Sequence, residues 1–221
     1  YDLAPAALAA LADHGVAIKP TRSGPWLHSL MVSCVTASIE LACLARSDIA
    51  FISQSQILAL ADVELRWPTQ IADPNSGKVY RKDLLPDAVF GLEYRTEHGS
   101  RYRFFALEAD RATEPATSAN FNRKSFERHL LQYAEYIEAA GYRKHLRLSA
   151  PMLVLNVTSD RTRMERLIRL TAKNFPHGND YQLFQHWMDF GPVFVPPKPL
   201  SALIDEDWQL APRGSFKIGL A

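Results

Sequence analysis

Cysteine is scarce in this sequence, and its spacing excludes several classes of protein. The 221 residues contain two cysteines, Cys34 and Cys43. They lie nine residues apart in one expected helix, where about 100° per residue puts them on opposite faces, so they cannot pair with each other. No Cys-x-x-Cys pair and no Cys/His zinc spacing is present. The sequence therefore predicts reduced thiols in a cytoplasmic protein, rather than a disulfide scaffold or a structural zinc site.

Long hydrophobic runs and an excess of charge are missing as well. We find no run of about 18 uncharged apolar residues, so we expect no membrane-spanning segment, and no signal peptide is visible. The 25 basic and 24 acidic residues leave a net charge of +1. Overall charge therefore does not identify a nucleic-acid partner, and only local basic patches could attract phosphates. The composition, with 47% apolar residues, is typical of a soluble globular domain.

What the sequence does contain is an alternation of helical and strand patterns, which predicts a mixed α/β fold. The expected loops are a polar stretch over 67–78, a turn at 97–100 and a loose tail after residue 210. Gly91 is expected to interrupt one strand. The predicted helices cover 4–14, 26–46, 54–65, 117–141, 161–174 and 180–190, and the predicted strands cover 48–53, 84–95, 101–110, 150–160 and an edge strand at 193–200.

Three acids gather near one end of the predicted hairpin. Glu108 and Asp110 close its second strand and project to the same face because strand side chains alternate. Asp87 opens the partner strand. Carboxylates grouped in this way suit Mg²⁺ or Mn²⁺, which bind through one or two acids and keep several waters. The alternative is a solvated strand end at which Asp110 pairs with Arg111 or Arg103.

Four segments, in this order, resemble the replication-relaxation family of plasmid and mobile-element proteins. They are "PDAVF" (86–90), "FFALEADRAT" (104–113), "SFERHLLQY" (125–133) and "PMLVLNVTSDRTRMERL" (151–167). The resemblance covers roughly residues 26–170. That family in turn resembles the PD-(D/E)xK nuclease superfamily in its core. It implies a restriction-endonuclease-like α/β core of helix, three strands, helix and strand, with extra C-terminal helices.

The same resemblance implies a division of the chain into three parts. The opening "YDLAPAALAALADHG" is similar to the exit from a winged helix-turn-helix in that family, and the chain begins at Tyr1 rather than Met. We therefore expect residues 1–24 to be the remnant of an upstream winged-helix module and its linker. Residues 25–190 would form the nuclease-like domain, and residues 191–221 an edge strand and tail.

The resemblance assigns metal-binding and catalytic roles to the acids. Asp87 matches the superfamily's strand aspartate, and Glu108 matches the acid of its E-x-K element. Asp110, the third candidate metal ligand, stands where an active nuclease often has lysine. The next helix could supply that lysine, and Lys124 is the nearest candidate. In a regular helix, however, Lys124 would lie roughly 135° from the apolar stripe and face solvent.

Four further residues are candidates through the same resemblance. His129 occupies the position of the family's lysine, with Tyr133 one turn later on the same helical stripe, and His129 could act as a general base or a charged donor. His28 and Glu40, in the first long helix, are weaker candidates. A half-buried histidine bonded to a carbonyl is the structural alternative for His28.

These observations support three functional hypotheses. The first is a DNA-interacting protein of a plasmid or integrative element, acting in replication, relaxation or transfer. The second is an active Mg²⁺-dependent DNA endonuclease. The third is a non-enzymatic, dimerising adaptor for a replication or transfer protein, if Phe184, Trp187 and Phe190 are exposed rather than packed in a core. Basic clusters at 123–129, 142–147 and 161–169 would contact DNA phosphates, or would be solvated helix faces.

Overall fold

One mixed sheet organises the part of the chain that the computed structural model describes, which is residues 9–10, 13, 26–187 and 197–220. The central strands β5, β6 and β7 run parallel, and the flanking pairs are antiparallel. The prediction of a mixed α/β fold is therefore confirmed. The sheet order is β1 (Ile49–Ile52), β4 (Ala88–Thr96), β5 (Gly99–Asp110), β6 (Met152–Thr158), β7 (Asn179–His186), β8 (Trp208–Ala211) and β9 (Ser215–Phe216).

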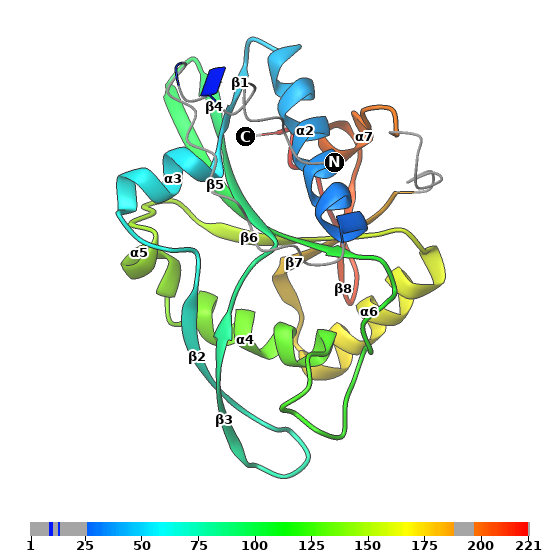
Figure 1. The fold of residues 1–221 in the computed structure, drawn as a ribbon. Helices are drawn as coiled ribbons and strands as arrows, with labels where there is room; N and C mark the ends of the chain where they lie inside the picture. The colour runs from blue at the N-terminus through cyan, green and yellow to red at the C-terminus, as the bar shows by residue number, and fades with distance from the viewer. Residues whose placement is uncertain (1–8, 11–12, 14–25, 188–196, 221) are drawn as a thin grey trace.

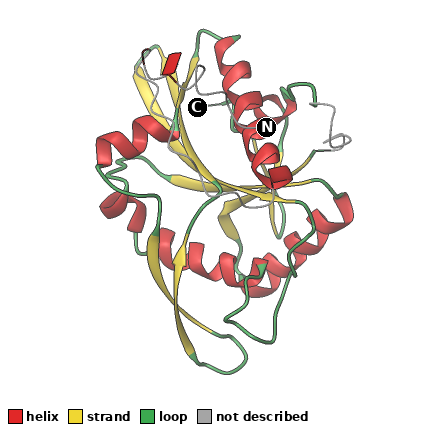
Figure 2. Ribbon diagram, viewed as in Figure 1, coloured by secondary structure: helices red, strands yellow, loops and turns green. Residues whose placement is uncertain are grey.

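Helices cover both faces of this sheet (Figures 1 and 2). One face carries α2 (Trp26–Leu44) and the short α7 (Ala202–Asp205), which contact each other. The other face carries α4 (Phe126–Glu138) and α6 (Arg161–Asn174), which are the crossovers into the two parallel strands β6 and β7. Two shorter helices complete the core: α3 (Gln54–Ala61) contacts β4, and α5 (Gly141–His145) contacts α4.

Local sequence signals account for these helices. Ser125 caps α4 by accepting a hydrogen bond from the Arg128 N–H, and Asp160 caps α6 by accepting from the Arg163 N–H. In α2 the residues that face the sheet recur about every four positions: Met31, Val35, Ile39 and Cys43 are all buried. Cys43 is buried and Cys34 half-buried, and both are free thiols, as predicted.

The helix α2 corrects the expectation drawn from hydropathy. It is 19 residues long with a mean hydropathy of 1.6, so by length and composition it could cross a membrane. In the structure its buried stripe packs against the sheet, chiefly on β1 and β5. A helix that covers a core and a helix that spans a bilayer share these two properties, because both bury apolar side chains.

A second, two-stranded sheet stands where the sequence predicts a polar loop, and that prediction is wrong. Strands β2 (Trp67–Ala72) and β3 (Val79–Leu84) form an antiparallel hairpin. Thr69 and Ile71 are buried and alternate with exposed neighbours, which is the period of a strand. The polar cluster between the strands is their turn, where Asp73 accepts hydrogen bonds from the Asn75 N–H and the Ser76 hydroxyl.

The helix predicted over 180–190 is also wrong, because residues 179–186 form strand β7 in the middle of the sheet. Phe184 and Trp187 are buried, so they do not form the exposed face that the adaptor hypothesis needs. Phe190 lies outside the described residues. The strands β8 and β9 extend the same sheet, so the expected loose tail is wrong too, and α7 is the sole helix described beyond β7.

Several details of the predicted elements differ from the structure, and three of them bear on the site or the sheet. Helix α4 begins at Phe126 rather than at residue 117, which leaves 111–125 as a loop. Strand β4 runs through Gly91 without interruption, since the Phe104 ring packs where a side chain would stand. The predicted α3 ends early, at Ala61.

Most of the remaining N- and C-terminal predictions lie outside the described residues. They are most of the winged-helix remnant at 1–24, with most of the helix over 4–14, and the first half of the edge strand at 193–200. The second half of that strand prediction is wrong, because residues 197–200 are described and form no strand. The turn predicted at 97–100 is present between β4 and β5 but is shorter: the chain turns at residues 97–98, and Gly99 already pairs with Thr96 as the start of β5.

Candidate functional site

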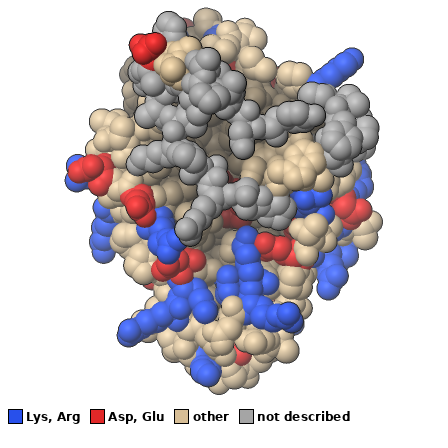
Figure 3. Space-filling model, viewed as in Figure 1, with Lys and Arg blue, Asp and Glu red and all other residues tan. Residues whose placement is uncertain are grey.

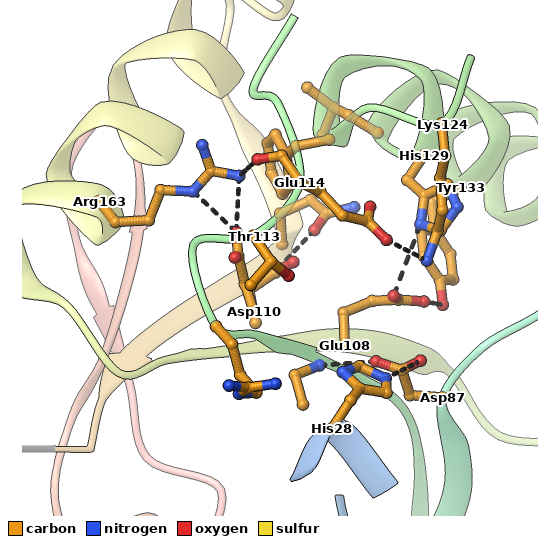
Figure 4. Close-up of a pocket in the computed structure, with 16 residues that line it drawn as sticks. His28, Asp87, Glu108, Asp110, Thr113, Glu114, Lys124, His129, Tyr133 and Arg163 are labelled. Carbon is orange, nitrogen blue, oxygen red and sulfur yellow. Dashed lines mark hydrogen bonds and ion pairs between the residues drawn. The ribbon is translucent and has the colours of Figure 1, made fainter. Parts of the chain in front are cut away.

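A narrow, open pocket lies where β5 ends, between the sheet and the first turns of α4 and α6 (Figure 4). Its lining comes from almost every element of the core: α2, the start of β4, the end of β5, the loop over 111–125, α4, β6, α6 and β7. The acids and bases that Figure 4 labels point toward one another across this space. The pocket therefore collects side chains that are far apart in sequence.

Asp87 lies beside Glu108 on the neighbouring strand, as the sequence predicts. Strand pairing places Ala88 opposite Leu107, so one step further along the same register brings Asp87 opposite Glu108. Asp87 Oδ1 accepts a hydrogen bond of 2.9 Å from His28 Nε2, and its Oδ2 accepts one of 2.9 Å from the Ala109 N–H. The hydrogen bond to Asp87 raises the pKa of His28, against the opposing effect of burial.

Glu108 is enclosed by the pocket walls, with 14% of its side chain exposed. The Tyr133 hydroxyl donates a hydrogen bond of 2.5 Å to Glu108 Oε1, and His129 Nδ1 lies 3.5 Å from Oε2. Burial, followed by the negative charge of Asp87, raises the pKa of Glu108. Burial and the charge of Glu108 also raise the pKa of Tyr133 well above its ordinary value, so its hydroxyl stays a neutral donor.

Asp110 has a different environment from Glu108, although both project to the same face of β5. Arg163, from the first turn of α6, donates to Asp110 Oδ2 through both Nε and Nη2, at 2.8 Å each. The same Nη2 donates to the Glu114 carbonyl oxygen at 2.9 Å, and Asp110 Oδ1 accepts from the Ala112 N–H. The alternative in which Asp110 pairs with Arg103 or Arg111 is therefore wrong, because its partner is Arg163.

Sequence reasoning missed Arg163, although a signal for it exists. Arg163 is 8% exposed and lies one turn before Leu167 on the buried stripe of α6. A cation on the apolar face of an amphipathic helix needs a buried partner, because an unpaired buried charge is costly. The carboxylate of Asp110 is that partner.

Lys124 lines the pocket, which corrects its expected position on a solvent-facing helix surface. Because α4 begins after the cap Ser125, Lys124 belongs to the loop before the helix. Its Nζ is 2.7 Å from Glu114 Oε1, and 45% of the side chain is exposed. Burial lowers the pKa of Lys124, but the hydrogen bond to Glu114 and the charges of Glu114, Glu108 and Asp87 outweigh it, and the net shift is upward.

Two buried amides that the sequence reading overlooked form the floor of the pocket. Asn156 of β6 is paired in register with Glu108, and its Nδ2 donates 2.8 Å to Gln182 Oε1 of β7. Both side chains are almost fully buried. A lone asparagine in the apolar strand "MLVLNVT" is the available signal, since a buried amide requires hydrogen-bond partners.

Glu40 lies away from this site. It is exposed and does not line the pocket. It stands twelve residues beyond His28 on α2, which is about 18 Å along a helix. Of the two weaker candidates, the structure brings His28 into the pocket and leaves Glu40 outside it.

The basic clusters divide between surface and interior. Arg128, His145 and Arg163 are buried, so these three residues belong to neither a solvated face nor a phosphate-contacting surface. Other basic residues of the same clusters are exposed, among them Arg123, Lys124, Arg143, Lys144, Arg147, Arg161, Arg166 and Arg169.

The donor set of the pocket fits a hard divalent cation in part. Among the described residues no group of three His, Cys, Asp or Glu side chains has the spacing of a metal site. Asp87 and Glu108 supply carboxylate oxygens on adjacent strands, and Mg²⁺ needs one or two such ligands, the rest being water and substrate phosphate. Asp110 is already held by Arg163. Asp87 and Glu108 are thus the residues that would hold the ion.

The comparisons with known proteins identify no relative. No family model matches the chain, and neither the curated proteins nor the solved structures include a match to it.

Proposed function

We propose that this chain is a DNA-interacting protein of the replication-relaxation type, from a plasmid or integrative element, built on a PD-(D/E)xK nuclease-like core. The order of elements supports this proposal. Leaving out the β2–β3 hairpin and the short helices α3 and α5, the chain runs α2, β1, β4, β5, α4, β6. That is helix, three strands, helix and strand, with Asp87 opening the second strand and Glu108 near the end of the third.

One observation carries the proposal: Asp87, Glu108 and Lys124 line a single pocket. The superfamily's core combines two acids with a lysine, and here Asp110 stands at the usual lysine position. Lys124, from the loop before α4, brings a cation to the same space, and its pKa responds to the charges of both acids. A phosphate group at this place would meet a lysine beside two carboxylates.

An active Mg²⁺- or Mn²⁺-dependent endonuclease is the second candidate, favoured by the same lysine. A bound cation would polarise the scissile phosphate and activate a water. The chain's own residues hold the acids in place: His28 and the Ala109 N–H fix Asp87, while Tyr133 and His129 orient Glu108. Lys124 would stabilise negative charge that develops on the phosphate.

The test combines DNA binding with nicking of supercoiled plasmid in Mg²⁺ or Mn²⁺. In the enzyme hypothesis, Asp87→Asn and Glu108→Gln each lower nicking by roughly 100-fold or more and leave DNA binding in place. Glu40→Gln, which removes an exposed carboxylate outside the pocket, is the matched control and should nick like the wild type.

The other outcomes separate the two candidates. DNA binding without metal-dependent nicking by the wild-type chain supports the DNA-interacting protein and rejects the endonuclease. Nicking that survives both substitutions assigns cleavage to another site or a contaminant. A chain that binds no DNA overturns the proposal itself. A replication or transfer protein and a second copy of the chain stay predicted partners, and light scattering measures the oligomeric state.

A further inference from the structure

The β2–β3 hairpin projects away from the main sheet and carries one uncovered face. In Figure 1 it extends beyond α4, at the opposite end of the molecule from the β4–β5 turn. Its inner side chains, such as Thr69 and Ile71, are buried, and β2 packs mainly against α4. Gln132 of α4 anchors this side by donating to the Thr69 hydroxyl at 3.0 Å. The hairpin is therefore held firmly on one face, and its outer face is free to meet a partner.

The outer face presents an arginine and a glutamine, two side-chain types that read DNA bases. Gln70 and Arg81 are cross-strand partners in the middle of the hairpin, and both are exposed. Toward the tip the pair Ala72–Val79 lies on the same face. Lys78, at the edge of the turn, is also exposed and lies over the Tyr80 ring. Arginine forms bidentate hydrogen bonds with guanine, glutamine does so with adenine, and small apolar groups tolerate the thymine methyl.

The charge of the hairpin is unbalanced in favour of cations. Its acids are engaged locally: Asp83 pairs with Arg66 at 3.2 Å, and Asp73 accepts the hydrogen bonds of the turn. Within the described residues, Lys78 and Arg81 form no ion pair with an acid. Two cations on an exposed, projecting strand pair are therefore available to phosphates.

The hairpin is joined to the loop that leads to the pocket. Tyr80 packs on Phe121 of the 111–125 loop with ring centroids 5.9 Å apart, and Lys78 Nζ lies 5.4 Å from the Tyr80 ring centre. That loop then carries the exposed Arg123 and the pocket-lining Lys124. Figure 3 shows Lys and Arg gathered over the lower half of the visible face, where the hairpin and the loop lie.

We infer that the β2–β3 hairpin is a DNA-contacting ribbon that enters a groove of duplex DNA, with Arg123 and Lys124 continuing the phosphate contacts toward the pocket. The major groove admits a two-stranded β-ribbon, and a net positive ribbon complements its phosphate walls. This inference rests on the proposed function and adds to it the partner, which is double-stranded DNA, and the surface that receives it.

The experiment measures the affinity of the full chain for a short DNA duplex by fluorescence anisotropy at several salt concentrations. The double variant Lys78→Gln/Arg81→Gln should bind roughly 10- to 100-fold more weakly at low salt, and the slope of log K against log salt should flatten by about 2. Arg95→Gln/Arg101→Gln, which removes two exposed charges at the β4–β5 turn, is the matched control and should match the wild type. Thermal unfolding checks that both variants fold.

Gln70→Ala and Arg81→Lys sharpen the test of groove entry. Both should retain most of the salt slope and lose discrimination among duplex sequences, since they remove base-reading groups and leave the charge count of the hairpin unchanged. Equal losses in the hairpin and control variants overturn the ribbon and leave the proposed function standing, provided the wild type binds duplex. A loss confined to single-stranded DNA or to RNA overturns the duplex assignment. A wild-type chain that binds no DNA overturns both proposals.

Discussion

Glu108 and Asp110 share one face of one strand, yet the fold treats their charges in opposite ways. Asp110 is clamped by the buried guanidinium of Arg163, which joins the end of β5 to the start of α6. Glu108 contacts a neutral hydroxyl, that of Tyr133, and the ring of His129, and its pKa is raised by burial. Asp110 therefore serves structure, whereas burial disfavours the charged form of Glu108, which a bound cation would stabilise.

The largest expected effect comes from breaking the clamp on Asp110. Arg163→Met leaves a mostly buried carboxylate and the Glu114 carbonyl oxygen without their donor, and we expect the free energy of unfolding to fall by about 3 kcal/mol. Urea denaturation at pH 7 measures it. The double variant Arg163→Met/Asp110→Leu should recover part of this loss, because it removes the orphaned charge. A single variant as stable as the wild type would show that the ion pair contributes little.

A smaller effect of opposite sign is expected at Glu108. Since its folded pKa is raised, the favourable contribution of Glu108 is complete below its ordinary value near 4.5 and is lost as the pH rises through the folded pKa. Glu108→Gln removes the cost of burying a charged carboxylate. At pH 8 the free energy of unfolding of the variant should therefore equal that of the wild type or exceed it by about 1 kcal/mol. Denaturation at pH 4.5 and pH 8 tests the sign: a gap that favours the wild type more at pH 8 contradicts this account.

His28 is expected to show a weaker dependence in its own pH window. Its folded pKa is raised by the hydrogen bond to Asp87, so the stabilisation is complete below 6.5 and disappears as the pH rises through the folded pKa. His28→Gln should lower the free energy of unfolding by about 1 kcal/mol at pH 6 and by less at pH 9. Any Mn²⁺ affinity of the wild type should rise over the same window, because His28 loses its proton and its positive charge no longer competes with the ion for Asp87. Calorimetric titration at both pH values measures it, and Ser29→Ala is the neighbouring control.

The smallest effect on stability is expected at Lys124. Its pairing with Glu114 is largely solvent-exposed, so Lys124→Gln should change the free energy of unfolding by less than about 0.5 kcal/mol. Its effect on plasmid nicking should be far larger if the endonuclease hypothesis holds, because Lys124 lines the same pocket as Asp87 and Glu108. Lys173→Gln, an exposed lysine at the end of α6, is the control for both measurements. Equal nicking by the two variants would remove Lys124 from the chemistry.

The elements that the sequence predicts well are those with strong local signals. Helix α6 spans the predicted residues because Asp160 caps it and its apolar stripe repeats regularly. Strand β6 was recognisable as a fully buried run between polar segments. In both cases short-range pattern and tertiary burial agree, so no long-range information was needed.

The failures occur where the buried residues are few or polar. In the β2–β3 hairpin, Pro68 and the turn residues are typical of a loop, and they hide the alternation of buried and exposed side chains in two short strands. Strand β7 carries the buried Gln182 and Gln185 among its apolar residues, which blurs the period of two, and a short apolar run does not distinguish strand from helix. The sequence also predicts too early a start for α4, because the polar residues of the preceding loop resemble the first turn of a helix.

By itself, the sequence determined that the chain is a mixed α/β protein, that Glu108 and Asp110 share a face, and that His129 and Tyr133 share a helical stripe. These follow from the backbone periods of strand and helix. The tertiary structure alone decided which acid meets Arg163, that Lys124 turns toward the pocket, and that residues 67–84 form a projecting ribbon. Each of these depends on contacts between residues far apart in the chain, whose energies no local pattern encodes.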